Sequence, residues 1–217
     1  MQIVDPSYEI LSPIDGIAIL KHLEKIARTC YKSENLISED GESAKKIIKN
    51  LISAGHEAMI EHASVSVRFV CDLGFYKDIT RHRMASFAIE STRYCNYSKG
   101  KFGNEITVIN PVNIKEGTPE YDAWKKCMEN IEKTYLEMGD LDCKPDQLRM
   151  LLPHSIKADV NISCNLREWR HIFNLRARTK HAHPSIRQLM IPLLEEFKKK
   201  IPVVFDDIIV DQDAYVK

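Results

Sequence analysis

The segment from Arg81 to Tyr94 carries the densest set of polar and reactive side chains in the chain. In fourteen residues, Arg-His-Arg-Met-Ala-Ser-Phe-Ala-Ile-Glu-Ser-Thr-Arg-Tyr, it has three arginines, a histidine, a glutamate, a tyrosine and three hydroxyls. Charged groups this close to apolar ones are costly to order unless a partner or ligand satisfies them. The interleaved apolar residues argue against a solvated loop. Because G-x-S-x-G is absent, Ser91 is better interpreted as a hydroxyl donor to phosphate than as a nucleophile.

Arginines are concentrated, whereas lysines are scattered along the chain. Nine of the 11 arginines fall in two windows: Arg81, Arg83 and Arg93, then Arg149, Arg167, Arg170, Arg176, Arg178 and Arg187. The guanidinium fork binds phosphate bidentately, so this distribution favours a small anionic ligand. Two ion-paired helix faces would explain it equally well.

Composition narrows the class of protein. The 217 residues have a formal net charge of zero, which disfavours a polyanion such as nucleic acid as partner. Neither G-x-G-x-x-G nor a P-loop is present, so a dinucleotide would bind without those loops. The six cysteines show no C-x-x-C spacing. With no leader-like N-terminus and no long apolar run, we expect a cytoplasmic protein that does not contact membranes.

Periodicity and punctuation predict the elements that position these residues. Strands are expected at Gln2 to Val4, Ser64 to Cys71, Glu105 to Ile109 and Lys157 to Cys164. Helices are expected after Asp15, from Ser43 to Gly55, from Thr118 to just before Gly139, after Asn165 and near Pro184, with Pro192 kinking or dividing the last one. Asn165 and Glu168 resemble a capping box. The prediction is one α+β domain over residues 1–217, with long helices packed on a small, mostly antiparallel sheet.

The helix after Asn165 has two distinct sides. Arg167, His171, Asn174 and Arg178 are spaced to share one polar face. Arg176 is expected on the other, largely apolar face with Trp169 and Phe173. There it would either extend outward to solvent or pair with a buried anion.

Four segments together resemble the flavin-dependent thymidylate synthases. Arg81-His82-Arg83, seven residues and then Ser91 matches that family's hallmark, and Arg93-Tyr94 continues it. The resemblance extends from about Gly55 to Ala182 through Gly55-His56-Glu57 with Glu61-His62-Ala63, Arg149-Met150-Leu151-Leu152-Pro153, and Asn165-Leu166-Arg167 with Asn174-Leu175-Arg176-Ala177.

The resemblance implies an enzyme that methylates dUMP to dTMP, with methylenetetrahydrofolate as one-carbon donor and FAD, reduced by NADPH, as hydride carrier. It also implies a homotetramer whose active sites combine residues from several subunits. The implied FAD contacts are Arg81, His82, Arg83, Asn165, Arg167 and His171. The implied dUMP contacts are Asp78, Glu90, Ser91, Thr92, Arg93, Arg149 and Arg176, with Arg176 as the catalytic residue that favours ionised uracil.

Several positions depart from the family pattern. Asp78 stands where glutamine or glutamate is usual, Ala88 and Ile89 where asparagine and glutamate are common, and His171 where asparagine is common. The stretch Arg178-Thr179-Lys180-His181 is one residue longer than expected, which leaves any role of His181 open.

Two other functions compete with this interpretation. His56, His62, His181 and His183 could bind a metal, but their spacing fits no H-E-x-x-H site, so we expect none. A non-enzymatic nucleotide- or RNA-binding module would explain arginines beside Phe87, Tyr94 and Tyr97. Flavin absorbance in the purified protein would separate the enzyme from both.

Overall fold

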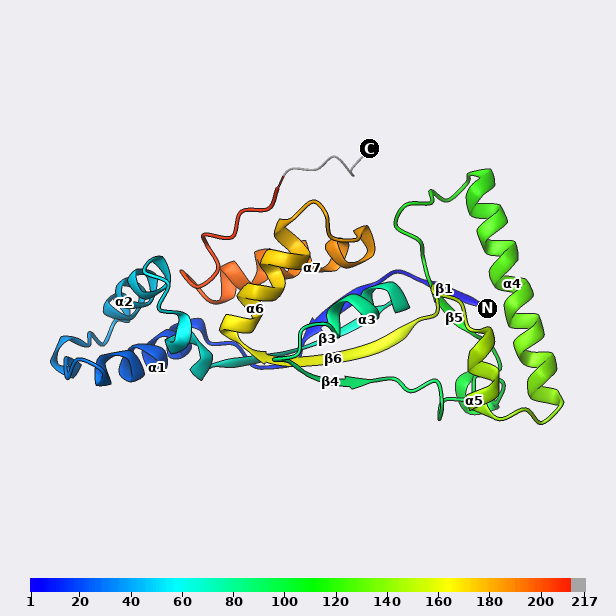
Figure 1. Ribbon diagram of the computed structural model, residues 1–217, viewed down its shortest axis with the longest axis horizontal. Coiled ribbons are helices and arrows are strands. Elements are labelled where there is room, and N and C mark those ends of the chain that lie inside the picture. Colours follow the sequence, from blue (N-terminus) through cyan, green and yellow to red (C-terminus); the bar gives the residue numbers. More distant parts are fainter. Residues whose placement is uncertain (212–217) are drawn as a thin grey trace.

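The computed structural model describes residues 1–211 and has an α+β architecture (Figure 1). A four-stranded antiparallel sheet has the order β2 (Ser7–Ile10), β3 (Ser64–Cys71), β6 (Ala158–Asn165) and β4 (Ser86–Ile89). A separate parallel pair joins β1 (Gln2–Val4) to β5 (Thr107–Ile109). The predicted small, mostly antiparallel sheet is therefore confirmed.

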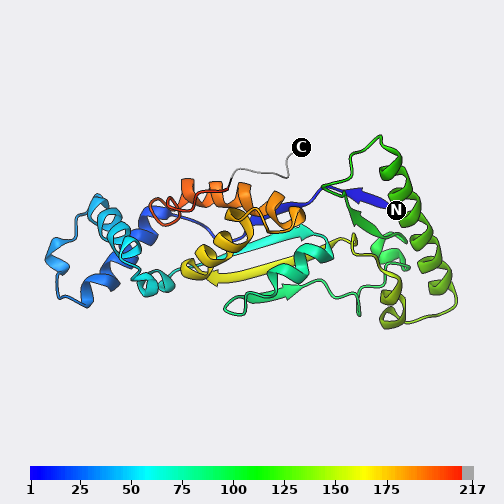
Figure 2. The same cartoon turned by 45° about the horizontal axis from the view of Figure 1, so that its top comes forward.

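The alternating pattern of β3 and β6 builds the main core. Val65, Val67 and Phe69 are buried on one face of β3, and Val67 stands opposite Ile162 of β6. Helices α3 (Leu73–Ile79), α6 (Leu166–Phe173) and α7 (Pro184–Lys200) lie over the sheet (Figure 2). Trp169 and Phe173 of α6 pack with Phe197 and Phe205, which fixes α6 against α7 and the segment that follows it.

Helices α1 (Gly16–Thr29) and α2 (Glu42–Ser53) follow their predicted boundaries closely. Asp15 caps α1 by accepting from the backbone N–H of Ala18 at 2.9 Å. Helix α2 begins just before the predicted Ser43, whose hydroxyl instead donates to Glu24 at 2.8 Å. Gly55 follows α2 with φ of 76°, as its predicted left-handed position requires.

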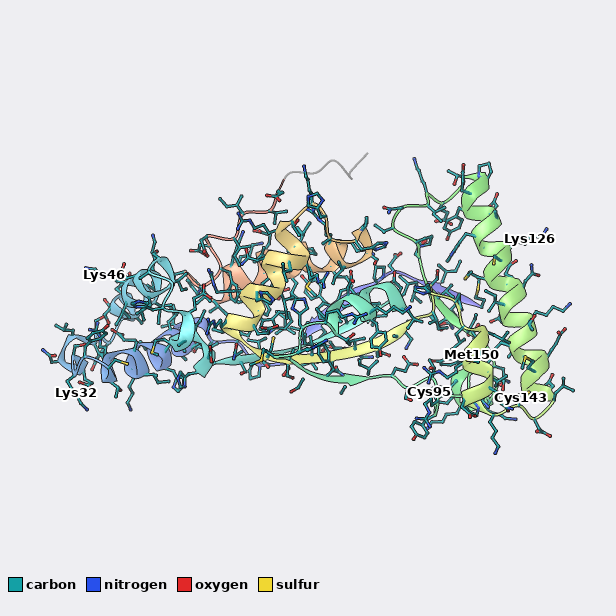
Figure 3. All side chains as sticks on the ribbon, viewed as in Figure 1. Lys32, Lys46, Cys95, Lys126, Cys143 and Met150 are labelled. Carbon is teal, nitrogen blue, oxygen red and sulfur yellow. The ribbon has the colours of Figure 1, made fainter. Side chains whose placement is uncertain are left out.

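A second cluster lies at the end of the molecule that carries α4 (Pro119–Asp140) and α5 (Pro145–Leu148). Thr118 caps α4 as predicted, accepting from Tyr121 N–H at 3.3 Å. The prediction that Gly139 lies beyond the helix is wrong. Gly139 sits in the last turn, where an added Cβ would come within 2.4 Å of Ser98 Oγ, so close packing explains the glycine. Figure 3 shows the labelled Lys126 and Cys143 at this end.

Three features of the fold were not predicted or were predicted differently. Strands β2 and β4 and helices α3 and α5 were missed. A π-helical turn, Asn174–Arg178, extends α6. Helix α7 continues through Pro192 and is not divided there, because buried residues on both sides hold it in place and the proline itself is exposed.

Short 3-10 helices occur at Glu34–Leu36, Glu57–His62, Gly100–Phe102 and Arg149–Leu151. Within residues 1–211, no helix has the length and apolar character that crossing a membrane requires.

Candidate active site

The predicted Arg81–Tyr94 segment folds as a tight turn, strand β4 and a second turn. Helix α3 ends at Ile79, whose carbonyl accepts from the His82 N–H at 3.2 Å. This turn exposes Arg81 and Arg83 and buries His82, which is 4% exposed. The hallmark residues are thus split between solvent and interior.

His82 lies among three polar side chains. Arg176 donates from Nε to His82 Nε2 at 3.2 Å, and His82 Nδ1 lies 3.4 Å from the Glu168 carboxylate. The His171 ring meets the His82 ring edge-on, with 5.4 Å between centroids. Burial, with the charges of Arg176 and His171, lowers the pKa of His82 to about 4. The imidazole is therefore neutral at neutral pH.

Arg176 occupies the π-helical turn and is held by α3 as well. Its terminal nitrogens lie 3.0 Å from the Asp78 carbonyl and 3.6 Å from the Asp78 carboxylate. The expected shared face with Trp169 and Phe173 is wrong. Arg176 contacts His82, the ring that also faces Glu168 and His171, whereas Trp169 and Phe173 are fully buried in the core. The π-helical turn changes the residue spacing after Phe173, so a face projected at 3.6 residues per turn fails there.

A first hollow brings together three of the six residues predicted for the flavin; Arg81, His82 and Arg83 are not in its wall. Asn165, Arg167 and His171 line it with Asn174 of the predicted polar face, whereas Arg178 is not in its wall. Met84 enters it from the turn before β4. The remaining wall residues, which were not predicted as contacts, are Glu57, Glu61, Glu168 and Arg170.

Ion pairs order the wall of the first hollow. Arg170 makes a bidentate pair with Asp207, at 2.6 and 2.8 Å, and contacts Glu57 at 3.0 Å. Its hydrogen bond lowers the pKa of Asp207. Arg167 pairs with Glu61 at 2.5 Å but keeps half of its side chain exposed. Arg167 can therefore exchange partners with a ligand, whereas Arg170 is bound into the structure.

The predicted capping box at the start of α6 is half formed. Asn165 accepts from the Glu168 N–H at 2.9 Å, which caps the helix. The Glu168 carboxylate turns away from the cap and faces His82.

A second hollow brings together predicted nucleotide contacts from two segments. Glu90, Ser91, Thr92 and Arg149 line it, with Lys157 as a further cation. Its apolar wall consists mainly of Leu73, Tyr76, Ile89, Leu152 and Ile156. Asp78, Arg93 and Arg176 are not in its wall; Arg93 is exposed and lies 5.9 Å from the centre of the Tyr94 ring.

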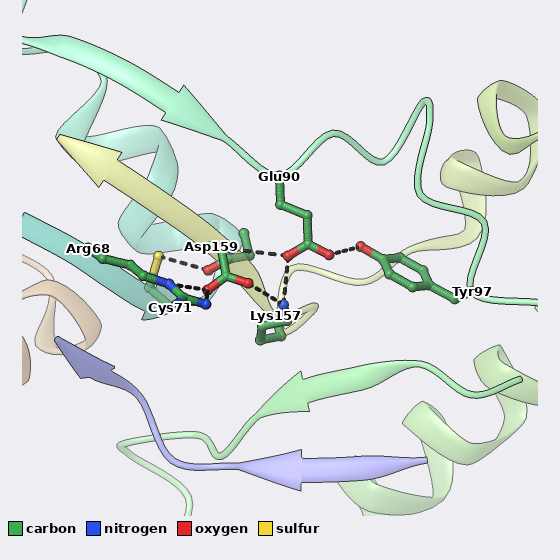
Figure 4. A network of polar contacts seen from close by, with 7 residues as sticks. Arg68, Cys71, Glu90, Tyr97, Lys157 and Asp159 are labelled. Carbon is green, nitrogen blue, oxygen red and sulfur yellow. Dashed lines mark hydrogen bonds and ion pairs between the residues drawn. The ribbon is translucent and has the colours of Figure 1, made fainter. Parts of the chain in front are cut away.

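A polar network connects two wall residues of the second hollow, Glu90 and Lys157, to side chains beyond it (Figure 4). The Glu90 carboxylate accepts from the Tyr97 hydroxyl and from Lys157 Nζ, both at 2.7 Å. Lys157 also contacts Asp159 at 2.7 Å, and Asp159 pairs with Arg68 at 2.8 Å. Burial and the Glu90 hydrogen bond raise the pKa of Tyr97. Both Glu90 oxygens thus already have protein partners.

Within the described residues, four arginines have no carboxylate partner that neutralises their charge. Among residues 1–211, Arg81, Arg83, Arg93 and Arg149 form no ion pair within 4.0 Å of a carboxylate. Unneutralised guanidinium groups beside hydroxyls suit anionic phosphate oxygens. The side chains present therefore fit nucleotide ligands, including a flavin nucleotide with its pyrophosphate.

Metal-type ligands gather at one place in the described part of the chain. His82, Glu168 and His171 offer ligand atoms within 4.8 Å of one another. His56, His62, His181 and His183 are exposed and belong to no such cluster in residues 1–211.

Comparisons with known proteins agree with the resemblance. Residues 19–203 match the family model described as thymidylate synthase complementing protein. A flavin-dependent thymidylate synthase of Pyrococcus abyssi is 28% identical over 171 residues, covering 78% of this chain and 69% of the relative. That of Pyrococcus furiosus is 30% identical over 165 residues, covering 76% and 66%. That of Corynebacterium efficiens is 26% identical over 202 residues, covering 85% and 78%.

Solved structures show the same fold. The UMP/dUMP methylase PolB from Streptomyces cacaoi, bound with 5-Br dUMP, aligns with a TM-score of 0.75 and 20% identity, covering 94% of this chain and 95% of that one. Its complex with 5-Br UMP gives a TM-score of 0.74 at 17% identity, with 94% of each chain covered.

Proposed function

Because this chain belongs to the flavin-dependent thymidylate synthase family and is an enzyme of that type, we propose that it methylates dUMP to dTMP. The curated relatives carry this activity in their names, and the structural neighbour is described as a UMP/dUMP methylase. The ligands and residue roles below are part of the same proposal.

One observation carries the proposal: a single segment reaches both hollows. Met84, directly after Arg81-His82-Arg83, lines the first hollow, and Ser91 and Thr92 line the second. Strand β4 lies between them and pairs with β6, so the sheet fixes their separation. This arrangement suits two nucleotide ligands that must react with each other.

The first hollow is proposed to hold FAD, which when bound supplies the hydride for the new methyl group. The contacts would come from Arg81, His82, Arg83, Asn165, Arg167 and His171. His82 is neutral and buried, and its ring nitrogens face Arg176 and Glu168, so it contributes no charge and would act by holding neighbouring side chains in place.

The nucleotide would lie along the second hollow and toward Arg176. Ser91, Thr92, Arg93 and Arg149 would hold the phosphate, with Asp78 and Glu90 nearer the sugar and base. Arg176 would stabilise negative charge developing on the uracil ring, which makes the ring a better carbon nucleophile. Glu90 could contact the sugar or base only by exchanging a protein partner, because Tyr97 and Lys157 already occupy its oxygens.

The remaining partners complete the proposal. Methylenetetrahydrofolate would give the carbon and NADPH would reduce the flavin. A homotetramer would bring the exposed Arg81, Arg83 and Arg93 against ligands bound mainly by other subunits.

The decisive experiment incubates pure protein with dUMP, methylenetetrahydrofolate, FAD and NADPH and assays dTMP. Omission of each component shows which are required, and NADH in place of NADPH tests the nicotinamide preference. Absorbance of protein reconstituted with FAD tests binding separately. Failure to bind FAD at micromolar concentration would exclude the proposal and favour the nucleotide- or RNA-binding module.

A further inference from the structure

Three side chains from separate elements form a chain that ends at Arg176. Glu168 comes from α6, His82 from the turn after α3, and Arg176 from the π-helical turn. The Glu168 carboxylate lies 3.4 Å from His82 Nδ1, and His82 Nε2 lies 3.2 Å from Arg176 Nε. Glu168 and His82 are both buried: His82 is 4% exposed and Glu168 is 9% exposed.

The donors in this chain fix the tautomer of His82. The Arg176 Nε–H can only donate, so His82 Nε2 must accept. A neutral imidazole then carries its proton on Nδ1, the nitrogen that faces Glu168. The lowered pKa of His82 agrees with a neutral ring.

We propose that Glu168 is a positioning residue, which holds His82 as the Nδ1–H tautomer and thereby fixes the direction of the Arg176 guanidinium. The 3.4 Å contact is slightly longer than a usual N–H···O bond of about 2.7–3.2 Å, so Glu168 acts as a weak acceptor for the Nδ1–H. A carboxylate on that side favours the Nδ1–H dipole pointing toward it.

Glu168 has no other evident task for its carboxylate. Its backbone N–H receives the Asn165 cap, but its side chain does not complete a capping box. Among residues 1–211 its carboxylate has one partner within ion-pair distance, His82. Burial raises the pKa of Glu168, so keeping the carboxylate there is costly.

The consequence for Arg176 is a guanidinium fixed from two sides. Nε donates to His82, and a terminal nitrogen donates to the Asp78 carbonyl at 3.0 Å. Of the five N–H donors of a guanidinium, others stay available to a ligand. The role of Arg176 toward uracil rests on the proposed function; the tautomer of His82 does not.

A metal site is the rival explanation for the same cluster, since His82, Glu168 and His171 lie within 4.8 Å of one another. A metal needs an unprotonated imidazole nitrogen. Here Arg176 occupies Nε2, Nδ1 carries the proton, and the guanidinium charge repels a cation. The geometry therefore favours the hydrogen-bonded chain.

The test combines NMR with kinetics on full-length protein. The ¹⁵N shifts of the imidazole, assigned through His82→Gln, report which nitrogen carries the proton. The variants are Glu168→Leu, which removes the acceptor, and Glu168→Gln, whose amide oxygen keeps one. Ile172→Val is the matched control, because it softens the buried side of the same helix without touching the chain.

We expect Nδ1–H in the wild type and in Glu168→Gln. In Glu168→Leu only the Arg176 contact still favours that tautomer, so the Nδ1–H population should fall. With FAD saturating, Glu168→Leu should lower kcat about tenfold or more with little change in KM for dUMP. Glu168→Gln should recover most of the rate, and Ile172→Val should keep it.

Three results would overturn the proposal. One is an Nε2–H tautomer in the wild type. Another is equal loss of kcat in Glu168→Leu and Ile172→Val. The third is stoichiometric Co²⁺ binding whose visible bands disappear in Glu168→Gln, which would make the cluster a metal site. If Glu168→Leu does not fold, the wild-type spectrum and Glu168→Gln still decide. Absence of dTMP formation with the Nδ1–H tautomer present would count against the proposed function instead.

Discussion

The arginines of helix α6 and those of the Arg81–Tyr94 segment balance their charge in opposite ways. On α6, Arg170 is almost buried and pairs with Asp207 and Glu57, and Arg167 pairs with Glu61. In the Arg81–Tyr94 segment, the described residues place no carboxylate within 4.0 Å of its three guanidinium groups.

A guanidinium that is paired and buried stabilises the fold, whereas one left unneutralised is available to a ligand or a neighbouring subunit. Arg176 falls between the two classes, because its nearest carboxylate is 3.6 Å away and its closer partners are neutral.

Arg170→Ala should give the largest effect, which is a lower free energy of unfolding. It removes the bidentate partner of Asp207 and the 3.0 Å contact of Glu57, whose other cation, Arg167, lies 3.9 Å away. It also cuts the link from α6 to the segment after α7. The Asp207 side chain is 57% exposed, so solvent screens the charge that is left, and losing the hydrogen bonds of Arg170 to Asp207, Glu57 and Val204 should cost about 3 kcal/mol. Urea unfolding measures the loss. The control is Arg68→Ala, whose pair with Asp159 is nearly half exposed and should cost about 1 kcal/mol or less. Equal losses in both would erase the distinction between the regions.

Arg176→Ala should have the next largest effect, which is a loss of turnover rate. Removing one preorganised group at a developing charge costs roughly a hundred- to a thousandfold in turnover. The variant should stay folded and bind FAD. Arg176→Lys should recover only part of the rate, because a point charge does not reproduce the fork that contacts both His82 and Asp78. Turnover at saturating dUMP decides; near-normal activity in Arg176→Ala would remove it from the site.

His82 predicts a pH dependence of stability. Its pKa is about 4 in the folded protein and near 6.5 when unfolded, lowered by burial and by Arg176 and His171, with Glu168 facing it as the opposing charge. A depressed pKa means that the unfolded chain takes up the proton first. The contribution is complete above pH 6.5 and is lost as the pH falls toward 4.

Between pH 7.5 and 5 the wild type should therefore lose about 1–2 kcal/mol more than His82→Gln. Unfolding free energies at the two pH values measure the difference. Parallel losses in the two proteins would show that His82 is already protonated in the fold.

Arg149→Ala tests the arginines that have no carboxylate partner among the described residues. Arg149 is exposed and lines the second hollow, so its removal should change the unfolding free energy by less than about 0.5 kcal/mol. It should weaken dUMP binding about tenfold, since a hydrogen bond to a charged group contributes at least about 1.5 kcal/mol. Calorimetric titration with dUMP checks this, with the exposed Lys126→Ala on α4 as control. A lower free energy of unfolding with unchanged dUMP affinity would show that Arg149 stabilises the fold and does not bind the nucleotide.

The sequence predicted the long elements because their residues repeat regularly. Val65, Val67 and Phe69 alternate over a complete strand, and Asp15 and Thr118 cap their helices by local hydrogen bonds. Strand β4 was missed because Ser86 to Ile89 is four residues long and mixes small and apolar side chains. The face of Arg176 was wrong because nothing in the sequence marks a π-helical turn.

The site follows the same division. Resemblance grouped Ser91, Thr92 and Arg149, and they line one hollow. It could not supply the pair between Arg170 and Asp207, or that between Lys157 and Glu90, because such partners are distant in sequence and depend on how the sheet and helices pack.

Cys95→Ala should have the smallest effect and tests whether any covalent step belongs to this region. A thymidylate synthase that attacks dUMP through cysteine would need a reactive thiolate in the site. Cys71 and Cys164 are buried within the sheet, and burial raises the pKa of both thiols, so neither is suited to attack. Cys95 is the cysteine beside the hallmark segment, but its side chain packs against the cluster near α4 and does not line either hollow.

Cys95→Ala should therefore keep dTMP formation within about threefold of the wild type, the loss reflecting only the small packing change. The measurement is turnover at saturating dUMP and FAD, with the flavin spectrum confirming an intact cofactor site. Complete loss of turnover with that spectrum unchanged would show nucleophilic catalysis and would move the chemistry away from the guanidinium groups altogether.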